Sequence, residues 1–227
     1  MYEEDRLKKL EKLKEENINP YPHSLYHFIY PVRYIVNNPI TGRFVSTAGR
    51  IIGIRDHGNI VFLDLLDDGV KIQAVISREY TDEKDFWLFK KYIDQGDFIE
   101  IYGEIFYTKK GELSIKVKSF KILTKALKTF PGKYGHGVRD PELRYRKRYL
   151  DILLSPESRK IFEIKFNVIR YIREFLWERG FVEVETPILQ PIYGGAAARP
   201  FKVHIWAIDE EWYLRISPEL YLKRYII

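Results

Sequence analysis

Apolar and polar residues alternate at strand spacing through the middle of the chain, between residues 47 and 123. This alternation predicts strands over 47–54, 59–65, 71–76, 98–103 and 112–117. Between the third and the fourth of these segments, apolar residues recur at helical spacing and predict a helix over 82–93. The middle of the chain is therefore expected to form three strands, then a helix, then two more strands.

That order of elements is the order of the five-stranded OB barrel, whose surface and loops bind oligonucleotides. We expect the barrel to occupy residues 47–125. In front of it, residues 1–46 predict a helix over 3–17 with a narrow stripe of leucines, and then an extended arm. A connector over 126–156 follows the barrel, and residues 157–227 form a further domain.

The further domain begins with a long amphipathic helix. Ser155 and Pro156 have the form of a helix start, with a capping serine and proline in the first turn, and Gly180 is expected to end the helix. Large apolar and acidic residues then alternate over 181–185 and predict a strand. Pro187 is expected to stop that strand, because proline cannot donate to a further ladder bond.

A hairpin and the start of another helix complete the chain. Residues 201–207 and 211–216 are expected to pair as neighbouring strands, and Pro218 is expected to open a helix. The predicted fold class is α+β: an OB barrel, followed by the beginning of an antiparallel sheet domain with flanking helices.

Composition narrows the classes of protein without deciding among them. The 227 residues include no cysteine, which excludes disulfides, thiolate zinc sites and a cysteine nucleophile, and fits a reducing cytoplasmic interior. No apolar run approaches the ~20 residues of a membrane span, and the acidic start of the chain predicts no secretory signal. The formal charge of +6 suits a polyanion such as RNA, although many proteins without such a partner share it. The 17 tyrosines and 14 phenylalanines suit either base stacking or an aromatic core.

The connector carries a dense group of cations. Arg144, Arg146, Lys147 and Arg148 place four cations in five positions. They predict either a contact with a nucleic-acid phosphate backbone or a solvated helical face, and the composition favours neither.

A run of small residues, Gly194 to Ala198, lies near the end of the chain. Such a run lets another molecule approach the backbone closely. Arg199 follows the run, and Glu219 lies just beyond the next hairpin. A small-residue platform with a cation and a carboxylate nearby indicates a site for a small zwitterion, whereas the run alone is also typical of a flexible surface loop.

Four sequence strings together resemble the class II aminoacyl-tRNA synthetases, and within them the lysyl enzymes. The strings are FVEVETP at 181–187, which is similar to motif 1 of the class, GGAAARPF at 194–201, PELYLKR at 218–224 and RYRKRYLD at 144–151. An OB barrel in front of motif 1 is typical of the aspartyl, asparaginyl and lysyl group. The resemblance extends over the chain from about residue 5.

The resemblance implies that the barrel binds the U-rich anticodon of tRNA(Lys). By position, it implies that Phe62 and Arg55 stack on bases, that Gln73 recognises the middle base, and that Glu112 contributes a carboxylate. An aromatic face, a guanidinium plane and an amide are chemically suited to these tasks. The family usually has a Gly-Lys pair where this chain has Gly58 and Asn59, so one phosphate contact is expected to be absent.

For the further domain, the resemblance implies a lysine site and a dimer. Gly195, with Gly194, belongs to the loop that closes over the amino acid, and Glu219 holds its α-ammonium group through a charge-assisted bond. Motif 1, which includes Pro187, builds a homodimer interface. The resemblance assigns no role to Arg199.

The resemblance also implies ATP and Mg²⁺, whose ligands lie in motifs 2 and 3. Neither motif is found in the 227 residues, so no catalytic residue and no metal ligand is assigned within them. Two hypotheses follow. The chain is the N-terminal part of a lysine–tRNA ligase that acts with a C-terminal part, which could be a separate chain. Alternatively, it is a non-catalytic module that binds tRNA or single-stranded nucleic acid and dimerises.

Overall fold

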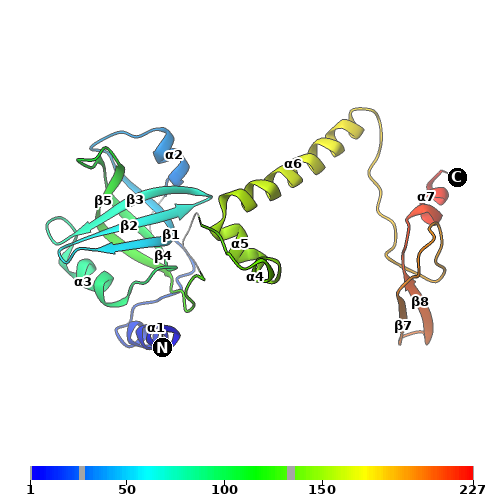
Figure 1. Cartoon of the computed structure of the whole chain (residues 1–227), viewed down its shortest axis with the longest axis horizontal. Coiled ribbons are helices and arrows are strands. Elements are labelled where there is room, and N and C mark those ends of the chain that lie inside the picture. Colours follow the sequence, from blue (N-terminus) through cyan, green and yellow to red (C-terminus); the bar gives the residue numbers. More distant parts are fainter. Residues whose placement is uncertain (1, 26–28, 132–135, 227) are drawn as a thin grey trace. The chain divides into compact units, whose positions relative to one another are not determined.

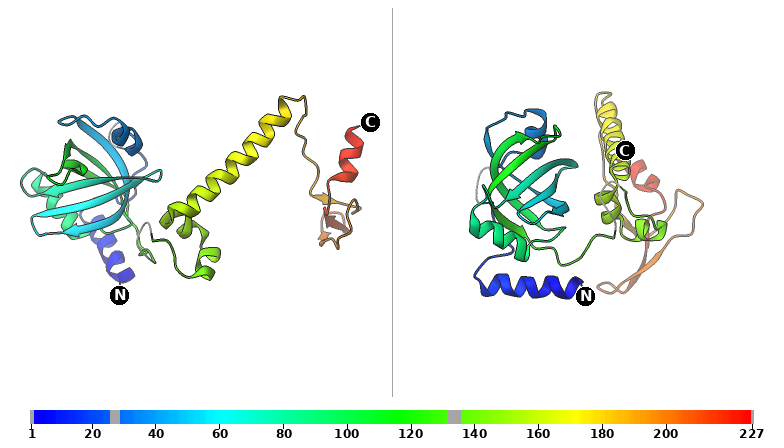
Figure 2. Two further views of the ribbon diagram at one scale, coloured as in Figure 1. Left: turned by 45° about the horizontal axis from the view of Figure 1, so that its top comes forward. Right: turned by 60° about the vertical axis from the view of Figure 1, so that its left-hand side comes forward.

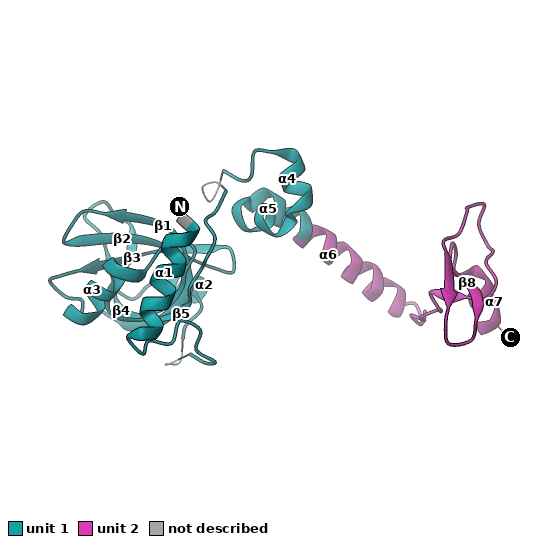
Figure 3. Ribbon diagram, turned by 90° about the horizontal axis from the view of Figure 1, so that it is seen from below, with its two compact units in different colours: residues 1–162 teal, residues 163–227 magenta. Residues whose placement is uncertain are grey.

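The computed structural model describes residues 2–25, 29–131 and 136–226. Residues 26–28 of the expected arm and residues 132–135 of the expected connector lie outside them. The chain divides into two compact units, residues 1–162 and 163–227 (Figure 3).

The first unit contains a closed five-stranded barrel, as the sequence predicts (Figure 1). Its strands, in the order in which they pair, are β1 (Phe44–Asp56), β2 (Ile60–Asp67), β3 (Val70–Ser77), β5 (Leu113–Thr124) and β4 (Phe98–Tyr107). Neighbouring strands are antiparallel except β3 and β5, which run parallel and close the barrel. Alternate residues point inward, and the fully buried interior includes Ile51, Leu63, Ile72, Ala74, Ile99, Ile101, Ile115 and Val117.

The strands of the barrel are longer than the alternation predicts, most of all β1. Its first half pairs with β4 and its second half with β2, and the register shifts between Ile51 and Gly53. A strand that serves two neighbours in this way has to bend. Close approach of strands also explains Gly103, because a Cβ there would lie 2.0 Å from the carbonyl oxygen of Lys116.

Three helices surround the barrel. Helix α3 (Glu83–Tyr92) lies between β3 and β4, as expected, and buries Phe86, Phe89 and Tyr92. Helix α1 (Tyr2–Glu15) lies below the strands, in dark blue in both views of Figure 2. Helix α2 (Val32–Asn37) is not predicted by the sequence pattern. Its start depends on a contact from elsewhere in the chain, because the Val32 N–H donates to the carboxylate of Asp67 over 3.0 Å.

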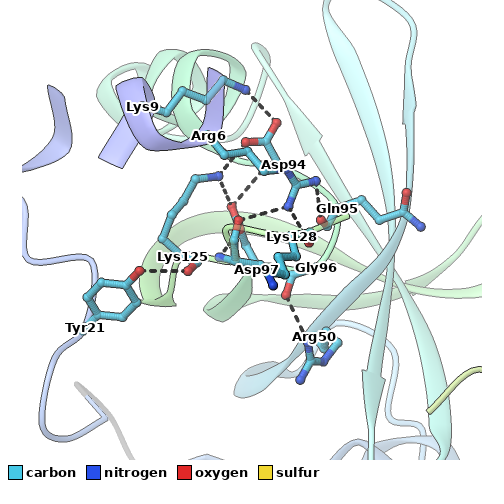
Figure 4. Close-up of polar contacts among 11 residues, drawn as sticks. Arg6, Lys9, Tyr21, Arg50, Asp94, Gln95, Gly96, Asp97, Lys125 and Lys128 are labelled. Carbon is cyan, nitrogen blue, oxygen red and sulfur yellow. Dashed lines mark hydrogen bonds and ion pairs between the residues drawn. The ribbon is translucent and has the colours of Figure 1, made fainter. Parts of the chain in front are cut away.

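A buried cluster of charges joins α1, the loop before β4 and the segment after β5 (Figure 4). The fully buried ammonium group of Lys125 lies 2.6 Å from Asp94 and 2.7 Å from Asp97. Asp94 also accepts from Lys9 over 2.6 Å, and Asp97 accepts from the N–H of Ala126 over 2.8 Å. A charge is tolerated away from water only when it is paired and hydrogen-bonded in this way.

The pKa values of the two carboxylates in the cluster are shifted in opposite directions. Burial raises the pKa of Asp97, although Lys125 opposes the rise. Burial also acts to raise the pKa of Asp94, but hydrogen bonds from Lys125 and Lys9 outweigh it and leave that pKa below the ordinary value. Beside them, Arg6 donates to the carbonyl oxygens of Gln95, Ala126 and Lys128.

Short helices follow the barrel. They are α4 (Pro141–Arg146) and α5 (Arg148–Leu154), and the long helix α6 (Pro156–Trp177) begins directly after them. Asp151 is fully buried and accepts from Arg144 over 2.8 Å and from Arg148 over 2.6 Å. Burial acts to raise the pKa of Asp151, but hydrogen bonds from Arg144, Ser158 and Arg148 prevail and lower it.

The second unit contains a three-stranded sheet and helix α7 (Glu219–Tyr225). The sheet consists of β6 (Leu189–Gln190), β8 (Glu210–Leu214) and β7 (Lys202–Ile205), in that order. The pairing of β7 with β8 confirms the predicted hairpin, and α7 starts directly after Pro218, as expected.

The prediction of a strand over 181–185 is wrong. These residues have no regular secondary structure, and the exposed fractions are 62% for Phe181 and 80% for Val182. Alternation describes a segment with one face covered, and no neighbouring strand pairs with this segment in the described part of the chain. Its ends are held instead by single bonds, from the Phe181 N–H to the Leu176 carbonyl and from the Tyr225 hydroxyl to the Glu185 carbonyl.

We predict that Lys125→Met lowers the free energy of unfolding by about 3–5 kcal/mol, because it leaves the buried Asp97 without a cation. Urea denaturation followed by circular dichroism measures the change. Lys9→Met is the matched control: it removes a partly exposed cation from the same cluster and should cost less than about 1 kcal/mol. Equal losses in the two variants would contradict the prediction.

A second prediction concerns acid unfolding. Because the folded protein lowers the pKa of Asp151, the stability that this group contributes is present above pH 3.8 and is lost as the pH falls through the lower, folded value. Asp151→Asn should cost about 1–3 kcal/mol at pH 7 and flatten the loss of stability below pH 5. Urea titrations at several pH values measure this, with the exposed Asp82→Asn as the control. An unchanged slope in Asp151→Asn would show that this aspartate is not responsible.

Candidate functional site

The strand register places three of the residues expected at the anticodon site on one outer face of the barrel. Arg55 on β1 is opposite Phe62 on β2, and Asp64, two positions along β2, is opposite Gln73 on β3. The intervening Leu63 points into the barrel and is fully buried. Since side chains two apart on a strand share a face, Arg55, Phe62, Asp64 and Gln73 form one patch, called here the outer patch.

Phe62 belongs to this outer face and not to the core. Its side chain is half-buried, and the edge of the His57 ring meets it with the ring centroids 5.9 Å apart. The buried core of the barrel instead takes its residues from the other face of β2, including Val61, Leu63 and Leu65. The structure therefore excludes the interpretation of Phe62 as a core residue and leaves part of its ring accessible.

Arg55 is held in a fixed orientation beside Phe62. Its two terminal nitrogens donate to the two oxygens of Asp64 over 2.7 and 3.2 Å, and this pairing raises the pKa of Arg55. A bidentate contact fixes the plane of a guanidinium group as well as its position. The Asp64 carboxylate also lies close to the backbone of β1: a Cβ on Gly53 would be 2.8 Å from Asp64 Oδ2, so this position suits a residue without a side chain.

Gln73 is 5% exposed and hydrogen-bonded at both ends of its amide group. Its Nε2 donates to Glu112 Oε2 over 3.0 Å, and its Oε1 accepts from the Ser114 hydroxyl over 2.9 Å. Glu112 lies in the loop just before β5, not within the strand as the sequence predicts. The structure thus brings all four predicted residues onto neighbouring elements and pairs Gln73 directly with Glu112.

Asp64, Ser114 and His57 were not assigned to the site from the sequence. Asp64 could have been found there, because it follows Phe62 by two positions in a predicted strand and must share its face. Ser114 could not, because its contact with Gln73 arises from the parallel pairing of strands 41 positions apart in sequence.

Most of the connector cations have partners nearby. Arg144 and Arg148 bind Asp151, Arg144 also donates to the Ser158 hydroxyl over 3.1 Å, and Arg146 donates to Glu142 over 2.7 Å. These contacts tie α4, α5 and the start of α6 together. They assign a structural task to Arg144, Arg146 and Arg148, three of the four cations.

The small-residue loop packs against the start of α7. Gly195 has φ +83°, and a Cβ there would lie 2.9 Å from the Cβ of Glu219 and 3.0 Å from the Ser217 hydroxyl. A Cβ on Gly194 would lie 3.2 Å from the side chain of Leu220. The structure therefore brings together Gly194, Gly195 and Glu219, which the sequence separates by 24 positions or more.

The carboxylate of Glu219 is half-exposed and forms an ion pair with the side chain of Lys223. Its Oε1 lies 2.6 Å from the ammonium group of Lys223, one helical turn later. An exposed pair of this kind is weak, so another ammonium group can replace Lys223 at little cost. Arg199 is exposed, and its place gives it no specific role.

Pro187 lies in the irregular segment that precedes β6, where its carbonyl accepts from Gln190 over 3.1 Å. Further back along the chain, the end of α6 and the start of this segment form an apolar groove. The groove is lined by Ile169, Ile172, Arg173, Leu176, Trp177, Phe181, Val182 and Glu183.

The described residues contain neither a cluster suited to a metal ion nor a membrane-spanning helix. Among residues 2–25, 29–131 and 136–226, no group of three or more His, Asp or Glu side chains is placed to hold a metal ion. Over the same ranges, no helix has the length and apolar character needed to cross a bilayer.

Comparison with known proteins agrees with both parts of this description. Residues 45–123 match the family described as OB-fold nucleic acid binding domain, and residues 140–227 match the family described as tRNA synthetases class II (D, K and N).

Curated relatives extend the agreement along the whole chain. The chain is 45% identical over 234 residues to a lysine–tRNA ligase of Saccharolobus solfataricus, covering 100% of this chain and 47% of the relative. It is 41% identical to one of Methanoculleus marisnigri, covering 98% and 44%, and 40% identical to one of Thermotoga maritima, covering 100% and 46%. The chain thus spans a little under half the length of these relatives. Residues 140–227, which include the small-residue loop, are thus similar to the class II tRNA synthetases of the D, K and N group, and the relatives that match along the whole chain are lysine–tRNA ligases.

Proposed function

We propose that this chain is the N-terminal part of a lysine–tRNA ligase, in which the barrel binds the anticodon of tRNA(Lys). The observation that carries the proposal is the outer patch, where Arg55, Phe62 and Gln73 lie on adjacent strands with Glu112 beside them. From the sequence, the roles of these residues rested only on the position-by-position resemblance to the lysyl enzymes. Their presence on one outer face of an OB barrel is what an anticodon site requires.

The chemistry of the outer patch suits unpaired bases. The exposed part of the Phe62 ring offers a stacking surface, and the guanidinium plane of Arg55, fixed by Asp64, offers a second one. The amide of Gln73 supplies both a donor and an acceptor for the Watson–Crick edge of a base. Single-stranded RNA with exposed bases fits this combination better than duplex RNA, whose bases are stacked and paired.

The second part of the proposal is that Glu219 binds the α-ammonium group of lysine. The close packing of Gly194 and Gly195 against α7 puts backbone with almost no side chain beside this carboxylate. An amino acid could therefore approach closely, and its ammonium group would take the place now held by Lys223. The same loop would cover the bound amino acid.

The whole enzyme would use ATP and Mg²⁺ to activate lysine and would transfer it to tRNA(Lys). We place the groups that bind ATP and Mg²⁺ in the part of the relatives beyond the matched half. No step of the activation is assigned to residues of this chain.

Homodimer formation completes the proposal. The apolar groove at the end of α6 and the exposed Phe181 and Val182 leave hydrophobic surface that a second copy could cover. Pro187, which follows this surface along the chain, would lie at the edge of the interface. The protein would act in the cytoplasm, where tRNA is charged.

We predict that Phe62→Ala weakens binding of an anticodon stem-loop with the sequence UUU by about tenfold or more, because it removes a stacking surface worth about 1–3 kcal/mol. Fluorescence anisotropy at a fixed salt concentration measures the dissociation constant, since phosphate contacts make it depend on salt. The matched control is Phe44→Ala, which removes an exposed ring that packs against Tyr102 outside the outer patch. Unchanged binding in Phe62→Ala would contradict the placement of the anticodon on this face.

A further prediction separates the ligase from a non-catalytic binding module. The 227-residue chain should give no lysine-dependent ATP–pyrophosphate exchange alone, and should give exchange when mixed with the C-terminal part of the Saccharolobus solfataricus relative. In that mixture, Glu219→Gln should raise the KM for lysine by at least about tenfold, because the charge-assisted bond to the ammonium group is lost.

Each result of this experiment is decisive for one part of the proposal. Exchange by the chain alone would contradict the placement of the ATP site outside it. Absence of exchange in the mixture, when the intact relative is active under the same conditions, would favour the binding module. An unchanged KM in Glu219→Gln would remove this residue from the lysine site.

A further inference from the structure

His57 lies at the edge of the outer patch, in the hairpin between β1 and β2. It follows Arg55, a member of the patch, by two positions. Its ring meets the ring of Phe62 with the centroids 5.9 Å apart and the ring planes at 77°. The His57 side chain is exposed, so its imidazole is open to a bound molecule. A nucleotide whose base stacked on Phe62 would therefore bring its backbone close to His57.

Hydrogen bonds hold the hairpin that carries His57. The His57 N–H donates to the carbonyl of Ile60 over 2.9 Å and closes the turn. The carboxylate of Asp56 accepts from the N–H of Gly58 over 2.9 Å and also from the ammonium group of Lys90 on α3. The turn is thus tied both to itself and to a helix, and these contacts keep the imidazole beside the stacking ring.

The charged neighbours of His57 at the hairpin have partners of their own. Asp56 pairs with Lys90, and the hydrogen bond from Lys90 holds the pKa of Asp56 below its ordinary value. Beyond β3, the N–H of Arg78 donates to the hairpin backbone over 3.0 Å, and its guanidinium group lies 5.6 Å from the centroid of the Trp87 ring. An imidazole differs from these groups, because it ordinarily changes charge between pH 5 and pH 8.

The charged groups of the outer patch balance one another. Arg55 and the nearby Lys71 both face Asp64, over 2.7 and 3.8 Å. Hydrogen bonding to Asp64 raises the pKa of Arg55, and the charge of Glu112 adds to the rise. Two cations therefore meet two carboxylates, and their charges cancel. Affinity for a nucleic-acid backbone comes from cations that neutralise phosphates, and protonation of His57 would add one such cation.

We propose that His57 is a further RNA contact of the outer patch, which in its protonated form binds a phosphate next to the base that stacks on Phe62. The proposal rests on the proposed anticodon-binding function of this face. An imidazolium group donates from both ring nitrogens, and its hydrogen bonds to phosphate oxygens are charge-assisted. Because RNA would then bind the protonated form more tightly, anticodon binding should strengthen as the pH falls from 8 to 6.

The test measures binding of a stem-loop with the anticodon UUU at pH 6 and at pH 8, by fluorescence anisotropy at fixed salt. We expect the full chain to bind about fivefold more tightly at pH 6, as one exposed pair of opposite charges implies. His57→Gln should bind equally at both pH values, about as tightly as the parent does at pH 8. His57→Lys, which is charged at both pH values, should bind at pH 8 about as tightly as the parent does at pH 6.

The dependence on salt identifies the contact as one with a phosphate. Each phosphate neutralised on a single strand adds about 0.7 to the slope of log affinity against log salt. The slope of the parent should therefore be steeper by about 0.7 at pH 6 than at pH 8, and that of His57→Gln should be the same at both. The matched control is His23→Gln, which removes another exposed histidine, before the barrel, and should keep the pH dependence of the parent.

The possible results separate this inference from the function on which it rests. A stem-loop that binds Phe62→Ala as tightly as the parent would overturn the anticodon site and the role of His57 with it. If binding depends on Phe62, a parent that is insensitive to pH, or a pH dependence that persists in His57→Gln, would overturn the role of His57 alone. Weakening of His57→Gln by one factor at both pH values would do the same, because it would show that the ring only packs against Phe62. Thermal unfolding of each variant at both pH values identifies any loss caused by misfolding.

Discussion

The parallel pairing of β3 with β5 closes the barrel, and the arrangement of the outer patch depends on it. Gln73, Ala74 and Val75 meet Ser114, Ile115 and Lys116 at this seam. Without it, two strands would carry unpaired edges, and Gln73 would have neither Ser114 nor Glu112 beside it. The same contact therefore completes the hydrogen bonding of the sheet and brings together the polar groups of the proposed base-binding site.

Buried carboxylates organise the ends of the first unit. Asp97 holds Lys125 and the backbone after β5, while Asp151 holds Arg144 and Arg148 where α4, α5 and α6 meet. In both places basic side chains neutralise a buried carboxylate, although only Lys125 is itself fully buried. Net charge alone is therefore a poor guide to the residues that face RNA. The side chain of Arg55 pairs with Asp64 on the outer face and stays 46% exposed.

The second unit shows how a small sheet can position a loop. The β6–β8–β7 sheet and α7 bring Gly194 and Gly195 against Glu219, and this contact requires residues without side chains. The proposed lysine site is therefore one wall, a carboxylate beside bare backbone. The proposed ATP site belongs to the remaining length of the relatives.

The sequence by itself determined the elements whose signals are local. Alternation, helical spacing and turn residues were sufficient for the five strands of the barrel, for α3, α6 and the β7–β8 hairpin, and the quoted motifs were sufficient for the family. Only the tertiary structure decided features that depend on distant neighbours. Helix α2 begins where Asp67 accepts from its first N–H, residues 181–185 stay irregular because no strand in the described part of the chain pairs with them, and the Gln73 amide is held by Glu112 and Ser114 from the distant strand end. A local pattern states which face of a segment can be buried, whereas the partner that buries it, or completes its hydrogen bonds, is supplied by closure of the fold.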